Sequence, residues 1–153
     1  MKRIIWLVIL ELLGFAIAAS AQTISPLTAE YGKKADGFFT VQNNSLQPVV
    51  VTVEPRSFSA DEQGRQIFRP LDSGVHAKVD STSARIGPKS SHIFSYKVTC
   101  DVLPCSMTFL TRTTAGRTPE GFEVALHLPH TVYTCNKAKD CRKTVLEALH
   151  VQP

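Results

Sequence analysis

Four cysteines are the residues of this sequence with the most readily recognised chemistry. Cys100, Cys105, Cys135 and Cys141 form two closely spaced pairs, and two kinds of chemistry fit such a set. Four thiolates can bind a structural zinc ion in a tetrahedral site. In an oxidising compartment, an even number of cysteines instead indicates disulfides. The choice between zinc and disulfides therefore depends on whether the chain is exported.

The first residues have the layout of a secretory signal peptide. Lys2 and Arg3 precede an apolar stretch over residues 4–19, and Ala19-Ser20-Ala21 matches a small-x-small cleavage site. A membrane anchor is the alternative, but the stretch is shorter than the ~20 residues of a spanning helix and contains Glu11. We therefore predict a signal peptide over residues 1–21 and a periplasmic or secreted protein with no stable membrane anchor after cleavage. Export favours disulfides over zinc at the four cysteines.

No other motif of the sequence points to catalysis. His127 and His130 form an H-x-x-H pair, but residues three apart on a strand point to opposite faces. The sequence has no G-x-S-x-G nucleophile elbow, no paired catalytic carboxylates and no glycine-rich phosphate loop. Asn43-Asn44-Ser45 fits the N-glycosylation pattern, but we interpret it as an elbow between strands. We predict that the protein is not an enzyme and has no metal or cofactor.

The formal net charge is +4, and much of it lies in the tail after Cys135. The basic residues there are Lys137, Lys139, Arg142 and Lys143. A nucleic-acid-binding protein is expected to carry a basic stripe with aromatic or arginine readers, and none is evident. We predict no nucleic-acid partner, one domain over residues 22–135 and a basic C-terminal tail over residues 136–153. Residues 145–149 of the tail are compatible with a helical turn.

Strand-type segments recur along the chain with turn signals between them, which is typical of an all-β sandwich. The expected strands cover residues 24–31, 38–42, 49–53, 66–68, 92–100, 106–112 and 122–133. Residues 70–83 are expected to be irregular, and residues 49–53 to be covered on both faces because they are almost continuously apolar. Pro26 in the first strand and Pro129 in the last cannot donate to a ladder, which places both strands at an edge or a bend.

The last expected strand carries an alternating apolar pattern. Phe122, Val124, Leu126 and Leu128 share one face of the strand. The simpler interpretation is that these side chains fill the core of the domain itself, because the strands of any sandwich alternate in this way. The alternative is that they contact a partner.

Three segments in this order resemble the N-terminal immunoglobulin-like domain of the periplasmic pilus-assembly chaperones, the PapD-like family. They are FFTVQNNSLQPVVVTVEP from Phe38, ARIGPKSSHIFSYKV from Ala84, and EGFEVALHLPHTVYT from Glu120. The resemblance covers residues 24–133 and implies an immunoglobulin-like antiparallel β-sandwich of about seven strands. In that family, the last strand of the chaperone lies in a groove of an incomplete pilus subunit, which is β-augmentation.

The resemblance implies partner contacts by Phe122, Val124, Leu126 and Leu128, with His130 near the position where the family has a lysine. The family also anchors the carboxylate of the subunit with an arginine on the first strand, and this chain has none there. The family also has a second domain, and we expect none here, because only the short tail follows residue 135. We therefore expect the fold of the family but not its anchoring of the subunit.

In such a sandwich the four cysteines come to one end, where the family's second domain docks. We expect two disulfides to close this end; spacing alone leaves the pairing open, with Cys100–Cys105 and Cys135–Cys141 slightly favoured. The predicted function is a periplasmic chaperone-like module that binds another envelope or pilus protein through an edge strand. The alternative is a secreted structural or adhesive domain without chaperone activity. A role as a pilus subunit is disfavoured because the last strand is present in the sequence.

Overall fold

The computed structural model describes residues 22–150, except residues 62, 64, 116–124 and 138. The predicted signal peptide lies outside the described residues, and so do Phe122 and Val124. The elements in chain order are β1 (Thr23–Ser25), β2 (Thr28–Tyr31), β3 (Lys34–Gln42), β4 (Val49–Ala60), β5 (Gln66–Arg69), β6 (Val75–Val79), β7 (Ser83–Ile86), β8 (Ser91–Cys100), β9 (Cys105–Ala115), β10 (Ala125–Thr134) and α2 (Cys141–His150). Among the described residues, no helix has the length and apolar character needed to span a bilayer.

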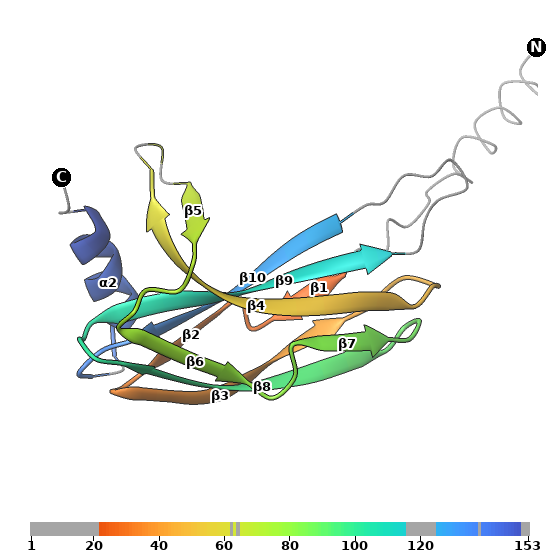
Figure 1. Cartoon of the computed structure of the whole chain (residues 1–153), viewed down its shortest axis with the longest axis horizontal. Helices are drawn as coiled ribbons and strands as arrows, with labels where there is room; N and C mark the ends of the chain where they lie inside the picture. The colour runs from red at the N-terminus through yellow and green to blue at the C-terminus, as the bar shows by residue number, and fades with distance from the viewer. Residues whose placement is uncertain (1–21, 62, 64, 116–124, 138, 151–153) are drawn as a thin grey trace, which may run out of the picture.

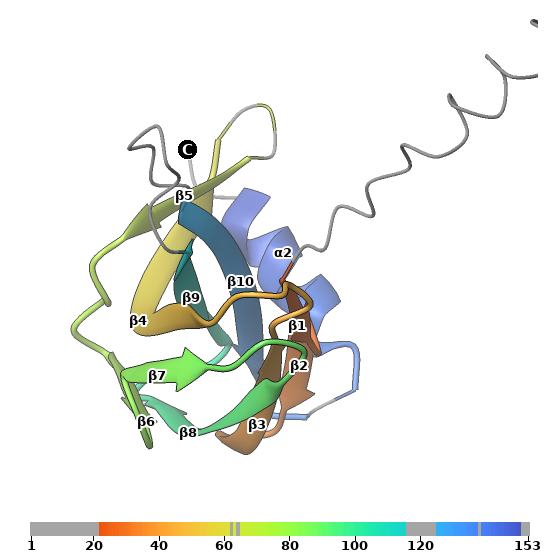
Figure 2. The same ribbon diagram turned by 90° about the vertical axis from the view of Figure 1, so that its right-hand side faces the viewer.

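The strands form two sheets packed face to face, so the predicted all-β sandwich is confirmed (Figure 1, Figure 2). One sheet has the order β1-β3-β8-β6, and the other has the order β2-β10-β9-β4-β5 with β7 also paired to β4. The neighbouring strands are antiparallel except for β2 and β10, which run parallel. Strands β4 and β9 are therefore central, and β10 lies beside β9 near the margin of its sheet.

The core between the sheets is built from alternating residues of the strands that face each other. In β8, Phe94, Tyr96 and Val98 are buried while the residues between them face solvent, as the sequence pattern predicts. Phe39 of β3 stacks on Phe94 with ring centroids 5.3 Å apart. Phe109 of β9, in the other sheet, approaches the ring of Phe39. These aromatic contacts join the two layers.

The first expected strand is split into two short edge strands. β1 pairs with β3 in one sheet, and after Pro26 the chain crosses to the other sheet, where β2 pairs with β10. The proline has no N–H to donate and thus marks the point where the ladder with β3 ends. The expected edge position of this segment is confirmed in both sheets.

Two expectations about the middle of the chain were wrong. The segment expected to be irregular contains β6, whose Val75, Ala77 and Val79 face the core while the residues between them face solvent. Charged and turn-forming residues around these small apolar side chains conceal the period of two. The strand expected to be covered on both faces is buried on one face only, and Val50 is 44% exposed. With the split first strand and with β7, the described strands number ten rather than about seven.

The Asn43-Asn44-Ser45 elbow is built around a fully buried amide. The Asn43 Nδ2 group donates to the carbonyl oxygens of Gln47, Ile86 and Gly87 at 2.8–3.2 Å. Its Oδ1 atom accepts from the N–H and the hydroxyl of Ser45. One side chain thus joins the β3–β4 connection to the β7–β8 connection, and its amide nitrogen is occupied by these bonds.

We expect Asn43→Ala to lower the free energy of unfolding by about 2–4 kcal/mol, because several buried polar groups lose their partners together. Urea denaturation of residues 22–153 measures this change. Gln47→Ala is the matched control, because the exposed side chain of Gln47 is removed while its carbonyl still accepts from Asn43. A loss below 0.5 kcal/mol in Asn43→Ala would contradict the assigned role.

The C-terminal tail forms a cap over one end of the sandwich. The disulfide Cys135–Cys141 ties the end of β10 to the start of α2, and Cys100–Cys105 joins β8 to β9. These are the adjacent pairs favoured from the sequence. Helix α2 buries Val145 with the disulfide sulfurs against Phe58 and Tyr133 in a small second core. Burial raises the pKa of Tyr133, with smaller electrostatic effects from Arg142 and Glu30.

Candidate partner-binding edge

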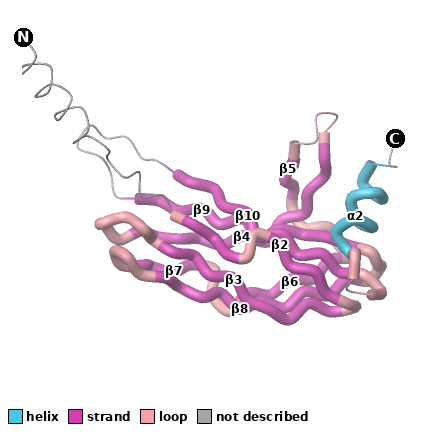
Figure 3. The backbone as a smooth tube through the Cα atoms, turned by 180° about the vertical axis from the view of Figure 1, so that it is seen from behind, coloured by secondary structure: helices cyan, strands magenta, loops and turns pink. Residues whose placement is uncertain are grey.

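Strand β10 has a free edge over half of its length. It pairs with β9 from Ala125 to Thr134, but on its other side β2 pairs only with residues from Thr131 onward. No strand of the described residues occupies the other side of the stretch from Ala125 to Pro129, which extends beyond β2 in Figure 3. This unpaired stretch of β10, Ala125–Pro129, is called the free edge below.

The hydrogen bonds further along β10 show which backbone groups face the free edge. The N–H groups of Thr131 and Cys135 donate toward β2, to Leu27 and Tyr31. Alternate residues of a strand direct their polar groups to the same side. Ala125, His127 and Pro129 therefore face the free edge. Ala125 and His127 offer both a donor and an acceptor there, whereas Pro129 offers only its carbonyl.

Leu126 and Leu128, two of the side chains predicted to contact a partner, lie on the face of β10 that is directed toward the core. Leu128 packs against the main core, and Leu126 is half-buried on the same face. For Leu128 the structure supports the simpler interpretation, that this face fills the domain's own core. The other two residues of the predicted contact, Phe122 and Val124, fall outside the described residues.

The expectation that His130 would contact a partner was wrong, because the structure places it in the core between the two sheets. Its side chain is fully buried, with its ring 5.0 Å from Phe39. Its Nδ1 atom lies 2.7 Å from the Pro26 carbonyl, and its Nε2 atom lies 2.9 Å from the Tyr96 hydroxyl. Nδ1–H therefore donates to the carbonyl, and Nε2 accepts from Tyr96 in the neutral ring. Burial lowers the pKa of His130, and the bond to Pro26 opposes this effect.

The opposite face of β10 borders a shallow cup on the outside of the sheet. His127 is exposed on this face, as expected for residues three apart on a strand. The cup has a volume of about 270 Å³, and its lining residues are Glu54, Arg56, Phe68, Leu110, Arg112 and His127. Sequence reasoning missed this group because its members come from four strands. The sequence signal is limited to spacing: Glu54 and Arg56 are two residues apart, as are Leu110 and Arg112. Residues two apart on a strand share one face.

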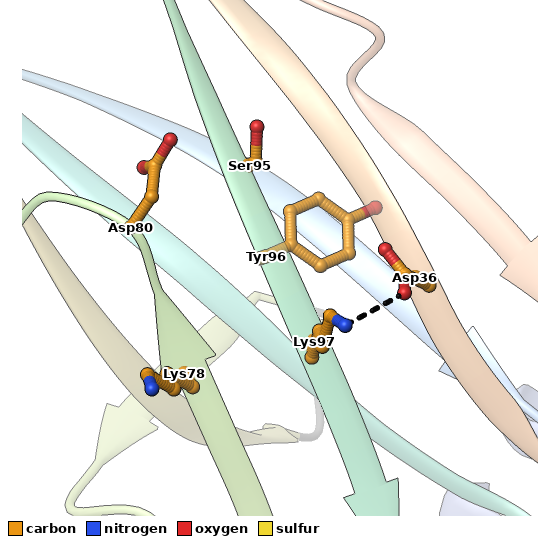
Figure 4. Close-up of a pocket in the computed structure, with 6 residues that line it drawn as sticks. All are labelled: Asp36, Lys78, Asp80, Ser95, Tyr96 and Lys97. Atoms are coloured by element: carbon orange, nitrogen blue, oxygen red, sulfur yellow. Dashed lines mark ion pairs between the residues drawn. The ribbon is translucent and has the colours of Figure 1, made fainter.

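A second hollow lies on the outside of the other sheet, over β3, β6 and β8 (Figure 4). It has a volume of about 250 Å³, and two carboxylates face two ammonium groups around it: Asp36, Asp80, Lys78 and Lys97. Lys97 and Asp36 form an ion pair at 3.3 Å. Because the charges balance, the hollow shows no preference for a ligand of either sign. In the described part of the chain, no three His, Cys, Asp or Glu side chains are grouped so that they could hold a metal ion.

No family model and no curated protein matches the chain. Solved structures do match it. A chain from the complex of the Salmonella enterica SafA pilin with the SafB chaperone aligns with a TM-score of 0.56 and 10% identity, covering 80% of this chain and 58% of that chain. WR4, a C. elegans MSP family member, aligns with a TM-score of 0.52 and 12% identity, covering 76% of this chain and 99% of that one. The YadV chaperone gives a TM-score of 0.50 and 12% identity, with coverages of 74% and 51%.

At these identities the matches show the fold alone. The chain has the immunoglobulin-like β-sandwich that pilus chaperones share with MSP domains. The resemblance seen in the sequence is therefore confirmed at the level of the fold. The chain spans about half of the YadV chaperone and nearly the whole of the MSP family member.

Proposed function

We propose that the protein is an exported binding module that captures another protein by adding a strand of that partner to the free edge of β10. The partner is another envelope or pilus protein, and the role is chaperone-like, in pilus or surface-fibre biogenesis. The observation that carries the proposal is the unpaired backbone from Ala125 to Pro129. Strand addition derives its affinity from such main-chain groups.

Three further features support this function. The shared fold includes pilus chaperones among its members. The two disulfides favour an oxidising compartment, which agrees with a periplasmic or secreted protein. β10 pairs with β9 along its whole length and Leu128 packs against the core, so that the free edge is already an extended strand before a partner arrives. No catalytic step is part of the proposal.

The test removes one backbone N–H group, that of His127, which faces the free edge. His127→Pro removes the donor that faces the free edge without removing a bond to β9, whereas His127→Ala changes the same side chain and keeps the donor. The probe is an immunoglobulin-fold pilin that lacks its final strand, mixed with tagged residues 22–153. We expect the alanine variant to bind the pilin like the unchanged protein and the proline variant to bind at least about fivefold more weakly, as for one lost hydrogen bond.

Unfolding curves of both variants show whether the domain itself survives. Equal binding by two stable variants would contradict strand addition at this edge. Absence of binding by the unchanged protein would favour the alternative of a secreted structural or adhesive domain.

A further inference from the structure

The two disulfides of the domain differ in their exposure to solvent. Cys135 and Cys141 are only 6% and 1% exposed, and they lie in the small second core under α2. Cys100 and Cys105 are both half-buried, and the loop between them is open to solvent, with Val102 77% exposed. A thiolate in solution can therefore approach the Cys100–Cys105 bond, whereas the domain must first open around the other bond.

A buried hydroxyl group lies beside both sulfurs of the exposed disulfide. The Oγ1 atom of Thr134 lies 2.8 Å from Cys105 Sγ and 3.4 Å from Cys100 Sγ. Since a disulfide sulfur carries no proton, the hydroxyl is the donor to sulfur. Thr134 lies opposite Cys105 in the ladder between β9 and β10, and only 1% of it is exposed, so the sheet fixes this geometry. A hydrogen bond to an ionised sulfur is stronger than one to a neutral sulfur, so negative charge is stabilised best on Cys105.

We propose that Cys100–Cys105 is a site of thiol–disulfide exchange, which a dithiol reductant opens while Cys135–Cys141 stays closed as a structural bond. The exchanged bond joins two strands of different sheets, β8 and β9. Both strands keep their ladders when it opens, because β8 pairs with β3 and β6, and β9 pairs with β4 and β10. This inference is independent of the proposed strand addition.

The direction of the exchange follows from the position of the Thr134 hydroxyl. A thiolate of the reductant attacks Cys100 Sγ and forms a mixed disulfide with it. The bond between Cys100 and Cys105 breaks, and its electron pair stays on Cys105 Sγ, where the hydroxyl donates to the new thiolate. The second thiolate of the reductant then attacks the reductant's own sulfur in the mixed disulfide and releases Cys100 as a thiolate. The dithiol is oxidised to a disulfide, and the protein gains the electron pair and takes up the protons that the dithiol has lost.

The experiment treats oxidised residues 22–153 with dithiothreitol under native conditions and quenches samples with N-ethylmaleimide. Mass spectrometry of the peptides then measures how fast each cysteine pair becomes labelled. We expect Cys100 and Cys105 to be labelled together, at least about tenfold faster than Cys135 and Cys141. Equal rates for the two pairs, or faster labelling of Cys135 and Cys141, would overturn the inference.

Two substitutions of Thr134 test its part in the exchange. Thr134→Val removes the hydroxyl and keeps the shape of the side chain, whereas Thr134→Ser keeps the hydroxyl. We expect the valine variant to open Cys100–Cys105 about three- to tenfold more slowly, because a thiolate without its donor is a poorer leaving group. The serine variant should react at the original rate. The rate at Cys135–Cys141 in the same samples is the internal reference and should not change. An unchanged rate in the valine variant, or an equal change at both disulfides, would contradict the assigned role of Thr134.

A monothiol identifies the sulfur that is attacked. Glutathione forms the mixed disulfide and has no second thiol to resolve it, and N-ethylmaleimide then labels the cysteine that has left. We expect glutathione mainly on Cys100 and the label mainly on Cys105. The opposite distribution would overturn the assigned direction of the exchange.

Discussion

Replacing both Cys135 and Cys141 by alanine is expected to release helix α2 from the sandwich and to lower the free energy of unfolding by about 2–3 kcal/mol. The disulfide closes a short loop that positions α2 over Phe58 and Tyr133. A single helix of this length is marginal in water, so without the covalent tie it depends on one small apolar cluster. Its release would expose that cluster to solvent.

Limited trypsin digestion measures the release directly, because Arg142 and Lys143 lie in the first turn of α2. We expect rapid cleavage there in the Cys135→Ala, Cys141→Ala double variant and slow cleavage in the unchanged protein. The matched control is the Cys100→Ala, Cys105→Ala double variant, which loses the disulfide between β8 and β9 but keeps the tie to α2. If both double variants resisted trypsin at α2 equally, packing rather than the disulfide would hold the helix.

The second large effect is a loss of stability in mild acid that originates at His130. Burial lowers the pKa of His130 in the folded protein below the ordinary value of 6.5, so the unfolded chain takes up the proton first as the pH falls. The free energy of unfolding should therefore decrease below about pH 6.5 by up to about 1.4 kcal/mol per pH unit, until the folded protein also binds the proton. Above pH 6.5 this contribution to the pH dependence vanishes.

Chemical denaturation between pH 8 and pH 5 measures this loss. His130→Phe should remove most of the pH dependence in that range, and the lost bond to the Pro26 carbonyl should cost about 1–3 kcal/mol at neutral pH. His76→Gln is the control, because it removes an exposed histidine outside the core. An unaltered slope in His130→Phe would show that other groups cause the loss. The carboxylates of Asp61 and Asp72, whose pKa values are lowered, act only at more acidic pH.

His130 lies in β10, the strand that carries the free edge, and the cap formed by α2 contacts the same strand. His130 connects β10 to the strand crossover at Pro26 and to Tyr96 of the opposite sheet. The cap of α2 covers the other end of β10, beyond Tyr133. Between these two points β10 is paired on both sides, and only the stretch before His130 is open for a partner.

Much of the architecture could be predicted from local patterns. Alternating apolar residues and turn signals identify a β-sandwich, and this needs no knowledge of which strands pair. Prolines identify edges because a missing N–H has the same consequence in any sheet. The strand β6 was missed because it is short and its inward residues are small. The helical turn expected in the tail is confirmed as part of α2.

The candidate site was harder to predict, because its residues are neighbours only through pairing. His130 follows the inward period of its strand, but its burial depends on hydrogen bonds to a carbonyl and to a hydroxyl that are remote in the sequence. The outer cup depends on the register of β4, β9 and β10. Register is set by the simultaneous packing of whole sheets and cannot be derived from one segment.

The fold class, the alternation of inward and outward residues and the close spacing of the cysteines could be predicted from the sequence, since these follow from side-chain type and local period. Three features are visible only in the folded protein: β10 is open from Ala125 to Pro129, His130 is internal, and Arg112 lies beside His127. They could not be predicted from the sequence because strand pairing and burial depend on contacts between distant segments. One residue has the same local pattern whether its strand is paired on one side or on two.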